Sequence, residues 1–189
     1  MVAMTSNLPE TFNGLPLAEL RQIPEQLREA PEQGLLGFEA RTTWLGGLKS
    51  RSVIEAFEAG GQRIERRHVI DADEPVQVLG GDTAPNPQEL LFSAIGSCLT
   101  AVYAVYATQL AIPIRSLRVE LRGTLDMRGV LGLADVAPGF PEVGIRVFLD
   151  AEATPDQIQD LHQRVLAASP NYYHLTSAIP ARTQLVISG

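Results

Sequence analysis

The spacing of apolar and polar residues changes from a two-residue period to a helical one near residue 86. Before that point, three runs alternate in the manner of β-strands, over residues 38–44, 52–58 and 63–70. Glycine pairs at 46–47 and 60–61 separate the runs and predict turns. A loop rich in Pro, Gly and Asp then leads to the first long helix. We expect an antiparallel sheet ahead of that helix.

The long helix has a clear beginning in the sequence. Asn86 can cap it, Pro87 suits the first helical position, and Glu89 stands three residues after the cap. We expect the helix to run to about Leu110. No charge occurs over residues 90–112, which is long enough for a bilayer. Hydroxyl side chains interrupt this run and no Lys/Arg asymmetry flanks it, so we predict a core helix and no membrane partner.

The rest of the chain continues the mixed pattern. We expect strands at 117–125 and 142–149, a second helix from Thr154 to about Ala168, a helical turn opening at Ser169, and a last strand at 183–187. Residues 1–33 are rich in Pro, Glu and Gln, and we interpret them as a surface arm with a short helix ended by Pro24. Residues 34–189 form one domain in this interpretation. The order of elements predicts the α+β class, with the long helix packed on antiparallel sheet.

Composition and charge exclude several classes of protein. The net charge of −7 argues against a nucleic-acid partner and gives no attraction to anionic lipid. A single cysteine rules out an internal disulfide. The N-terminal residues lack the basic and apolar parts of a signal peptide, so we expect a cytoplasmic protein.

The one cysteine, Cys98, falls inside the long helix. It is either a core filler or a reactive thiol, and a reactive thiol needs its thiolate stabilised. The helix dipole acts within the first turn and does not reach Cys98. A cation from elsewhere is required, and spacing alone selects none of the candidates: Lys49, Arg51, Arg63, Arg66 and Arg67.

Other chemical signals are weak. His68, His162 and His174 lie far from one another and from Cys98, so no metal site and no cofactor is predicted. We expect His162 to face solvent among charged neighbours, and we keep His174 as a candidate pocket residue. The acidic residues 71, 73 and 74 are expected in a solvated loop.

Several motifs together resemble one family. They are Trp44-x-Gly46-Gly47 with Arg51 downstream, DEP at 73–75, NPQELL at 86–91, SCLT at 97–100, PGF at 138–140 and SPNYYHL at 169–175. This set is similar to the OsmC/Ohr family of osmotically inducible and organic hydroperoxide resistance proteins, from about residue 38 to 187. The resemblance implies an α+β fold in which antiparallel sheets wrap around long central helices in an intertwined homodimer. It also implies a role in oxidative-stress defence. Members reduce organic hydroperoxides with a cysteine thiolate that becomes a sulfenic acid and condenses with a second cysteine.

The resemblance also assigns residues. The peroxide-reactive position matches Cys98, and the arginine that stabilises its thiolate best matches Arg51, with Lys49 as the alternative. The glutamate that holds this arginine falls on Gln88, beside Glu89. The second cysteine falls on Ser169, which cannot form a disulfide. Further candidates for the pocket are Phe92, Tyr172, Tyr173 and His174.

Three hypotheses follow. In the first, Cys98 reduces a small apolar hydroperoxide in a one-cysteine cycle and is regenerated by an external thiol. In the second, the protein binds a small ligand or senses oxidants without turnover. In the third, Cys98 only fills the core.

Overall fold

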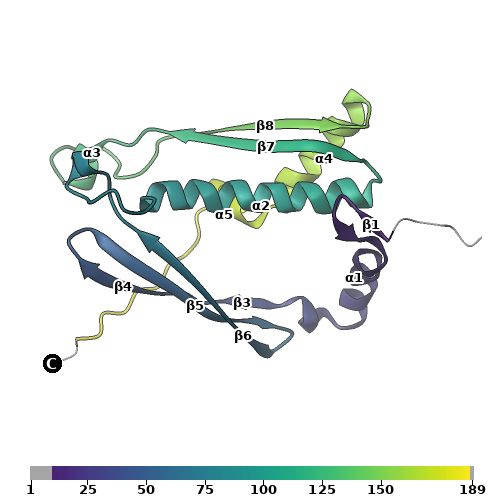
Figure 1. Ribbon diagram of the computed structural model, residues 1–189, viewed down its shortest axis with the longest axis horizontal. Coiled ribbons are helices and arrows are strands. Elements are labelled where there is room, and N and C mark those ends of the chain that lie inside the picture. Colours follow the sequence, from purple (N-terminus) through teal and green to yellow (C-terminus); the bar gives the residue numbers. More distant parts are fainter. Residues whose placement is uncertain (1–9, 188–189) are drawn as a thin grey trace, which may run out of the picture. The chain divides into compact units, whose positions relative to one another are not determined.

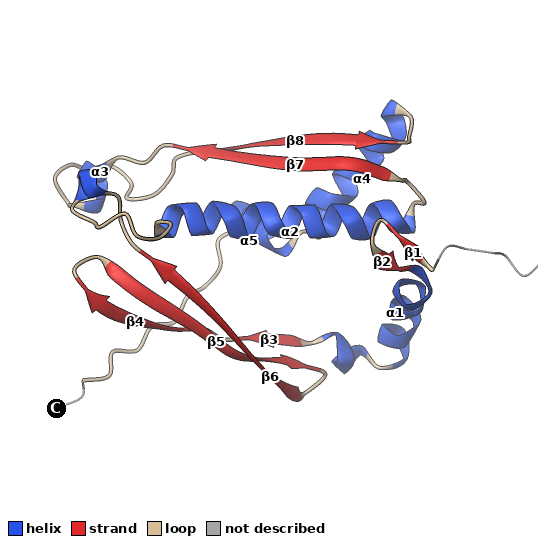
Figure 2. Cartoon of the chain, in the orientation of Figure 1, coloured by secondary structure: helices blue, strands red, loops and turns tan. Residues whose placement is uncertain are grey.

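The computed structural model describes residues 10–187 of the protein, and the chain divides into two compact units between Ser93 and Ala94. Figure 1 labels the elements along the chain, and Figure 2 separates helices from strands. The long helix α2, Pro87–Gln109, begins in unit 1 and continues in unit 2. The mixed helices and antiparallel sheets confirm the predicted α+β class.

Unit 1 opens with two short paired strands, β1 (Thr11–Phe12) and β2 (Leu15–Pro16), followed by helix α1 (Leu17–Glu29) and a 3-10 turn, Pro31–Gly34. The prediction that Pro24 ends this helix was wrong. Pro24 removes its own hydrogen bond to the carbonyl of Leu20 and its ring crowds that carbonyl, but the helix continues past it. The residues after it are good helix formers and carry the helix on.

The main sheet of unit 1 has four antiparallel strands, β3 (Leu36–Phe38), β4 (Arg41–Gly46), β5 (Lys49–Ala59) and β6 (Gln62–Ala72). β3 and β4 pair with opposite halves of β5, and β6 also pairs with β5. The sequence predicted one strand where β3 and β4 are separate. The break lies between the pairs Phe38–Phe57 and Arg41–Val53, where two residues face three residues of β5, and a bulge of this kind interrupts pairing. The predicted glycine turns are confirmed, since both glycines of each pair have positive φ.

A 3-10 turn, Val76–Val78, lies in the loop between β6 and α2. The predicted cap of α2 at Asn86 is confirmed by two hydrogen bonds. The Asn86 N–H donates to the Glu89 carboxylate, and the Glu89 N–H donates to the Asn86 side chain, both at 2.8 Å. This reciprocal pair fixes the first residue of the helix that carries Cys98.

Unit 2 is built on α2, the hairpin of β7 (Ile114–Gly123) and β8 (Val143–Ala151), and the helices α3 (Met127–Val130), α4 (Pro155–Ala168) and α5 (Pro170–Thr176). The hairpin runs alongside α2 in Figure 1. Buried residues recur every four positions along α2, at Ile95, Leu99, Tyr103 and Ala107, and they meet Leu161 and Val165 of α4. This spacing places one continuous face of α2 in the core. The predicted cap of α4 at Thr154 is also confirmed, as a capping box with Gln157.

Within the described residues, α2 is the one helix that is long and apolar enough to cross a membrane. Its buried positions form the centre of the unit 2 core. α2 is therefore the core helix of a folded unit, as the sequence predicted.

The end of the chain differs from the sequence prediction. Residues 183–187 were expected to form a strand, but the structure shows no regular element there. Leu185, Val186 and Ile187 are at least three-quarters exposed. A strand requires a hydrogen-bonded neighbour, and among the described residues β7 and β8 pair only with each other.

Candidate functional site

Cys98 and Ser169 are in direct contact in unit 2. Cys98 is partly buried on α2, and Ser169 is only 1% exposed at the junction of α4 and α5. The Cys98 Sγ lies 3.4 Å from the Ser169 Oγ, within hydrogen-bond range for sulfur. The structure thus brings together two predicted site residues that are 71 positions apart in the chain.

The position of Ser169 follows from its local sequence. Its N–H donates to the Val165 carbonyl and closes α4, while its hydroxyl accepts the Tyr172 N–H at 3.4 Å and opens α5. Pro170 occupies the first position of α5, where its missing N–H costs nothing. The Asn171 side chain then donates to the Ala94 carbonyl at 2.9 Å, which ties α5 to the α2 turn just before Cys98.

The preferred candidate cation, Arg51, is held by a carboxylate in unit 1. Arg51 on β5 is the register partner of Asp71 on β6. Its Nε and Nη2 donate to the two Asp71 oxygens at 2.7 and 2.9 Å. These hydrogen bonds, aided by the opposite charges, hold the pKa of Arg51 above its usual range and that of Asp71 below its usual range. Arg51 is therefore a fixed cation.

The alternative cation, Lys49, lies near a buried carboxylate. Asp73 is 1% exposed, and the Lys49 Nζ is 3.8 Å from its Oδ2. Asp73 also accepts the Thr83 hydroxyl and the N–H groups of Glu74, Gly81 and Thr83. The Thr83 hydroxyl bond is the largest cause that lowers the pKa of Asp73 to about 2, and it outweighs the opposing effect of burial. The expectation of a solvated acidic loop was wrong for Asp73, because this carboxylate organises the loop around itself.

Gln88, which the resemblance places at the family's glutamate position, and its neighbour Glu89 have different surroundings. Glu89 serves the cap of α2 through its bonds with Asn86. Gln88 is exposed on the first turn of the helix. Phe92, one turn further along, is partly buried.

A cleft of about 630 Å³ in unit 2 lies among β8, α4 and α5. Of the predicted pocket residues, Tyr172 lines it. Tyr173 and His174 are exposed and make an edge-to-face contact with each other. Cys98 and Ser169 are not among the residues that line this cleft.

Sequence reasoning missed a polar pair inside the cleft. His162 was expected to face solvent, but it is partly buried, and its Nδ1 is hydrogen-bonded to the Tyr103 hydroxyl. Burial raises the pKa of Tyr103 to about 12, so this phenol keeps its proton. One signal was present in the sequence. Ile158, His162 and Leu166 recur every four residues and so share one face of α4.

The comparison with protein families decides the identity. The family model for OsmC-like protein matches residues 80–184, more than half of the chain. The chain belongs to the OsmC-like protein family. The resemblance based on the NPQELL, SCLT and SPNYYHL segments is confirmed, and no curated protein sequence matches the chain.

Solved structures agree with this OsmC-like assignment. An OsmC-like protein from Mycoplasma pneumoniae superposes with a TM-score of 0.58 at 15% identity, covering 73% of this chain and 86% of that one. An OsmC-like protein of unknown function from Vibrio cholerae gives 0.54 at 14% identity, covering 74% and 94%. These two matches show the OsmC-like fold. The organic hydroperoxide resistance protein OhrB of Bacillus subtilis gives 0.47 at 17% identity, covering 74% and 91%.

Proposed function

We propose that this OsmC-like protein reduces organic hydroperoxides through Cys98 alone, with an external thiol in place of a second cysteine. The contact between Cys98 and Ser169 carries the proposal. A hydroxyl 3.4 Å from the sulfur can hydrogen-bond to a thiolate or a sulfenic acid, but it cannot close a disulfide. The family includes proteins named for hydroperoxide resistance, which supports the choice of substrate.

The proposed cycle has three steps. The Cys98 thiolate attacks one peroxide oxygen, the O–O bond breaks, and the alkoxide takes up a proton and leaves as an alcohol. Cys98 is then a sulfenic acid. The thiolate of an external thiol attacks the Cys98 sulfur, water leaves and a mixed disulfide forms. A second external thiol attacks the other sulfur of the mixed disulfide, Cys98 leaves as the thiolate, and the two external thiols, which have supplied the two electrons, leave as a disulfide.

Ser169 is suited to donate a hydrogen bond to the sulfur. Its hydroxyl has one proton to donate, and it already accepts the Tyr172 N–H. A donor helps to stabilise a thiolate. In this proposal Ser169 acts as a positioning residue that replaces the chemistry of the second cysteine with a hydrogen bond.

Arg51 is the cation we propose for the thiolate. Its two hydrogen bonds to Asp71 keep the guanidinium charged and fixed. Asp71 thereby supplies the carboxylate that Gln88 lacks. Lys49 remains the alternative, with its ammonium close to the buried Asp73.

We also propose that the protein works as a homodimer. The sheet of unit 1 carries large apolar side chains that are mostly exposed, and Phe38 and Trp44 are each 73% exposed. Exposed apolar groups of this kind normally mark an interface. A monomeric mass by light scattering would contradict the dimer.

We place the reaction in the cytoplasm, where thiols are kept reduced and can regenerate Cys98.

A non-catalytic role in ligand binding or redox sensing is the second candidate. Among the described residues, the side chain that hydrogen-bonds to Cys98 has a neutral hydroxyl, which stabilises a thiolate less than a cation does. The two functions differ in turnover. A steady-state assay of cumene hydroperoxide consumption with an excess of dithiothreitol should show many turnovers for the wild type and none for Cys98→Ser. A single equivalent consumed per chain would support the sensor and contradict the peroxidase.

A further inference from the structure

The cleft of unit 2 has the size and lining of a small-molecule site. Its volume of about 630 Å³ falls within the range of natural ligand pockets, roughly 300–1,000 Å³. The apolar row of β8 forms one wall, and the shared face of α4 forms another. The side chains that form these two walls are Val143, Ile145 and Val147 on β8 and Ile158, His162 and Leu166 on α4.

The Tyr103–His162 pair gives this apolar cleft a defined hydrogen-bond donor. Tyr103 is 1% exposed, and the His162 Nδ1 is the hydrogen-bond partner that the structure gives its hydroxyl. A buried phenol needs an acceptor for its proton, so we assign the phenol as the donor and Nδ1 as the acceptor. The imidazole proton of a neutral ring then resides on Nε2. His162 therefore offers an N–H donor at the edge of its ring away from Tyr103.

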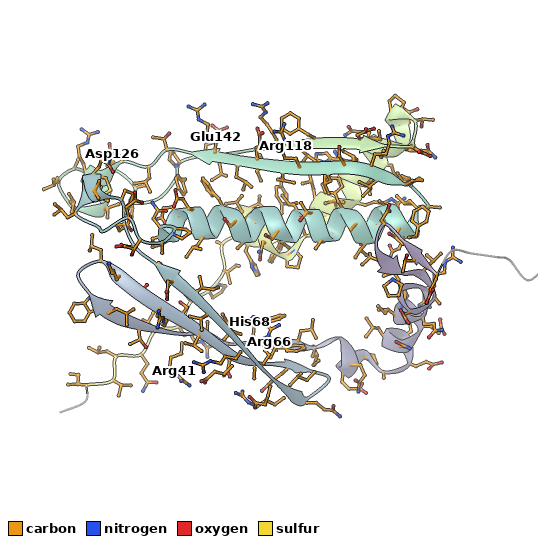
Figure 3. All side chains as sticks on the ribbon, in the orientation of Figure 1. Arg41, Arg66, His68, Arg118, Asp126 and Glu142 are labelled. Carbon is orange, nitrogen blue, oxygen red and sulfur yellow. The ribbon has the colours of Figure 1, made fainter. Side chains whose placement is uncertain are left out.

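The charges around the cleft favour an uncharged ligand. None of the described lining residues is Lys or Arg, so an anion has no counter-ion there. Glu142, exposed just before β8 (Figure 3), would repel an anion as well. Among the described lining residues the one counter-ion for a cation is Glu142, which is exposed, and burying a cation against the apolar walls of β8 and α4 is costly.

We infer that this cleft binds a small, uncharged, apolar molecule that carries one hydrogen-bond-accepting oxygen, such as a ketone, with the oxygen at His162. The site is separate from the proposed peroxidase chemistry, because neither Cys98 nor Ser169 lines it. Binding at this cleft is therefore tested independently of the proposed peroxidase function.

Two probes of the same shape test the donor. Acetophenone carries a carbonyl where α-methylstyrene carries a methylene group. Each is titrated into the full chain while the methyl resonances of Ile145, Val147, Ile158 and Leu166 are followed by NMR. We expect saturable shifts with acetophenone, and an affinity about five- to tenfold higher than that for α-methylstyrene, the effect of one net hydrogen bond. Equal affinities, or no saturable shift with either probe, would overturn the inference.

Two tryptophan variants test the location. Gln159 is exposed and lines the cleft, whereas Gln163 is exposed on the same helix and does not line it. Gln159→Trp should abolish the acetophenone shifts, and Gln163→Trp should preserve them. Shifts that persist in a folded Gln159→Trp protein would place the ligand elsewhere and overturn the site. Cys98→Ser should bind as the wild type does, which separates this result from any failure of the peroxidase proposal.

Discussion

Cys98 on α2 lies 3.4 Å from Ser169, the buried residue at which α4 ends and α5 begins. The sequence resemblance implies that Ser169 stands at the position of the family's second cysteine. A hydroxyl in contact with a thiol can form a hydrogen bond but not a disulfide.

Ser169→Cys should restore an internal disulfide. The two side chains already touch, so the sulfur atoms need to approach by little more than 1 Å to reach the bond length of about 2.05 Å. Oxidation with one equivalent of hydroperoxide should remove both free thiols, and turnover with a dithiol should become faster. Two thiols that remain titratable after oxidation would show that the backbone holds the side chains in the wrong orientation.

Ser169→Ala should affect both reaction rate and stability. It removes the proposed hydrogen bond to the sulfur and the cap of α5, and loss of a cap costs about 1 kcal/mol of unfolding free energy. Thr154→Ala is the matched control, because it removes the cap of α4 at a similar cost in stability without touching Cys98. Stopped-flow measurement with cumene hydroperoxide should show a slower reaction of Cys98 in Ser169→Ala only. Equal rates in both variants would show that Ser169 acts only as a helix cap and does not affect the reaction of Cys98.

Arg51→Ala and Asp71→Asn should both slow the reaction of Cys98, with the larger effect for Arg51→Ala. The first removes the proposed cation and the second releases it from its bidentate partner. Arg63→Ala is the control, since Arg63 is a β6 arginine paired with Glu39 and Glu65. The readout is the second-order rate constant for hydroperoxide at constant pH. If Lys49→Ala slows the reaction and Arg51→Ala does not, the thiolate partner is Lys49.

Asp73 should make the loop before α2 sensitive to acid. Its pKa is about 2 in the folded protein, below the ordinary value of 3.8. A carboxyl with a lowered folded pKa contributes stability above its unfolded pKa and loses that contribution as pH falls through the folded value. Asp73→Asn should lower the urea midpoint at pH 7, and the gap to the wild type should shrink between about pH 4 and pH 2. A gap that is constant over this range would contradict the role of the charged form.

The local parts of the fold were predictable from sequence because their signals are local. The caps at Asn86 and Thr154 and the glycine turns each depend on residues within three or four positions. The segment 183–187 has an apolar pattern typical of a strand, but a strand depends on a neighbour that the pattern does not specify. The division between β3 and β4 likewise depends on an extra residue in a different strand, β5.

Only those site residues that belong to a recognisable motif could be predicted from the sequence. Cys98 and Ser169 were paired through resemblance, and the structure places them in contact. The cross-strand pair of Arg51 with Asp71, and the bond between Tyr103 and His162, join residues 20 and 59 positions apart. Such pairs depend on strand register and helix packing, which no short motif contains.

The most direct test is the mass of the intact folded chain after brief exposure to one equivalent of cumene hydroperoxide, with dimedone present to trap a sulfenic acid. Since the chain has one cysteine, no internal thiol can capture the product. We predict one dimedone adduct, located at Cys98, and full recovery of the free thiol when an external thiol is added before dimedone. A Cys98 that stays unmodified in the folded protein and reacts only after unfolding would contradict the proposed chemistry.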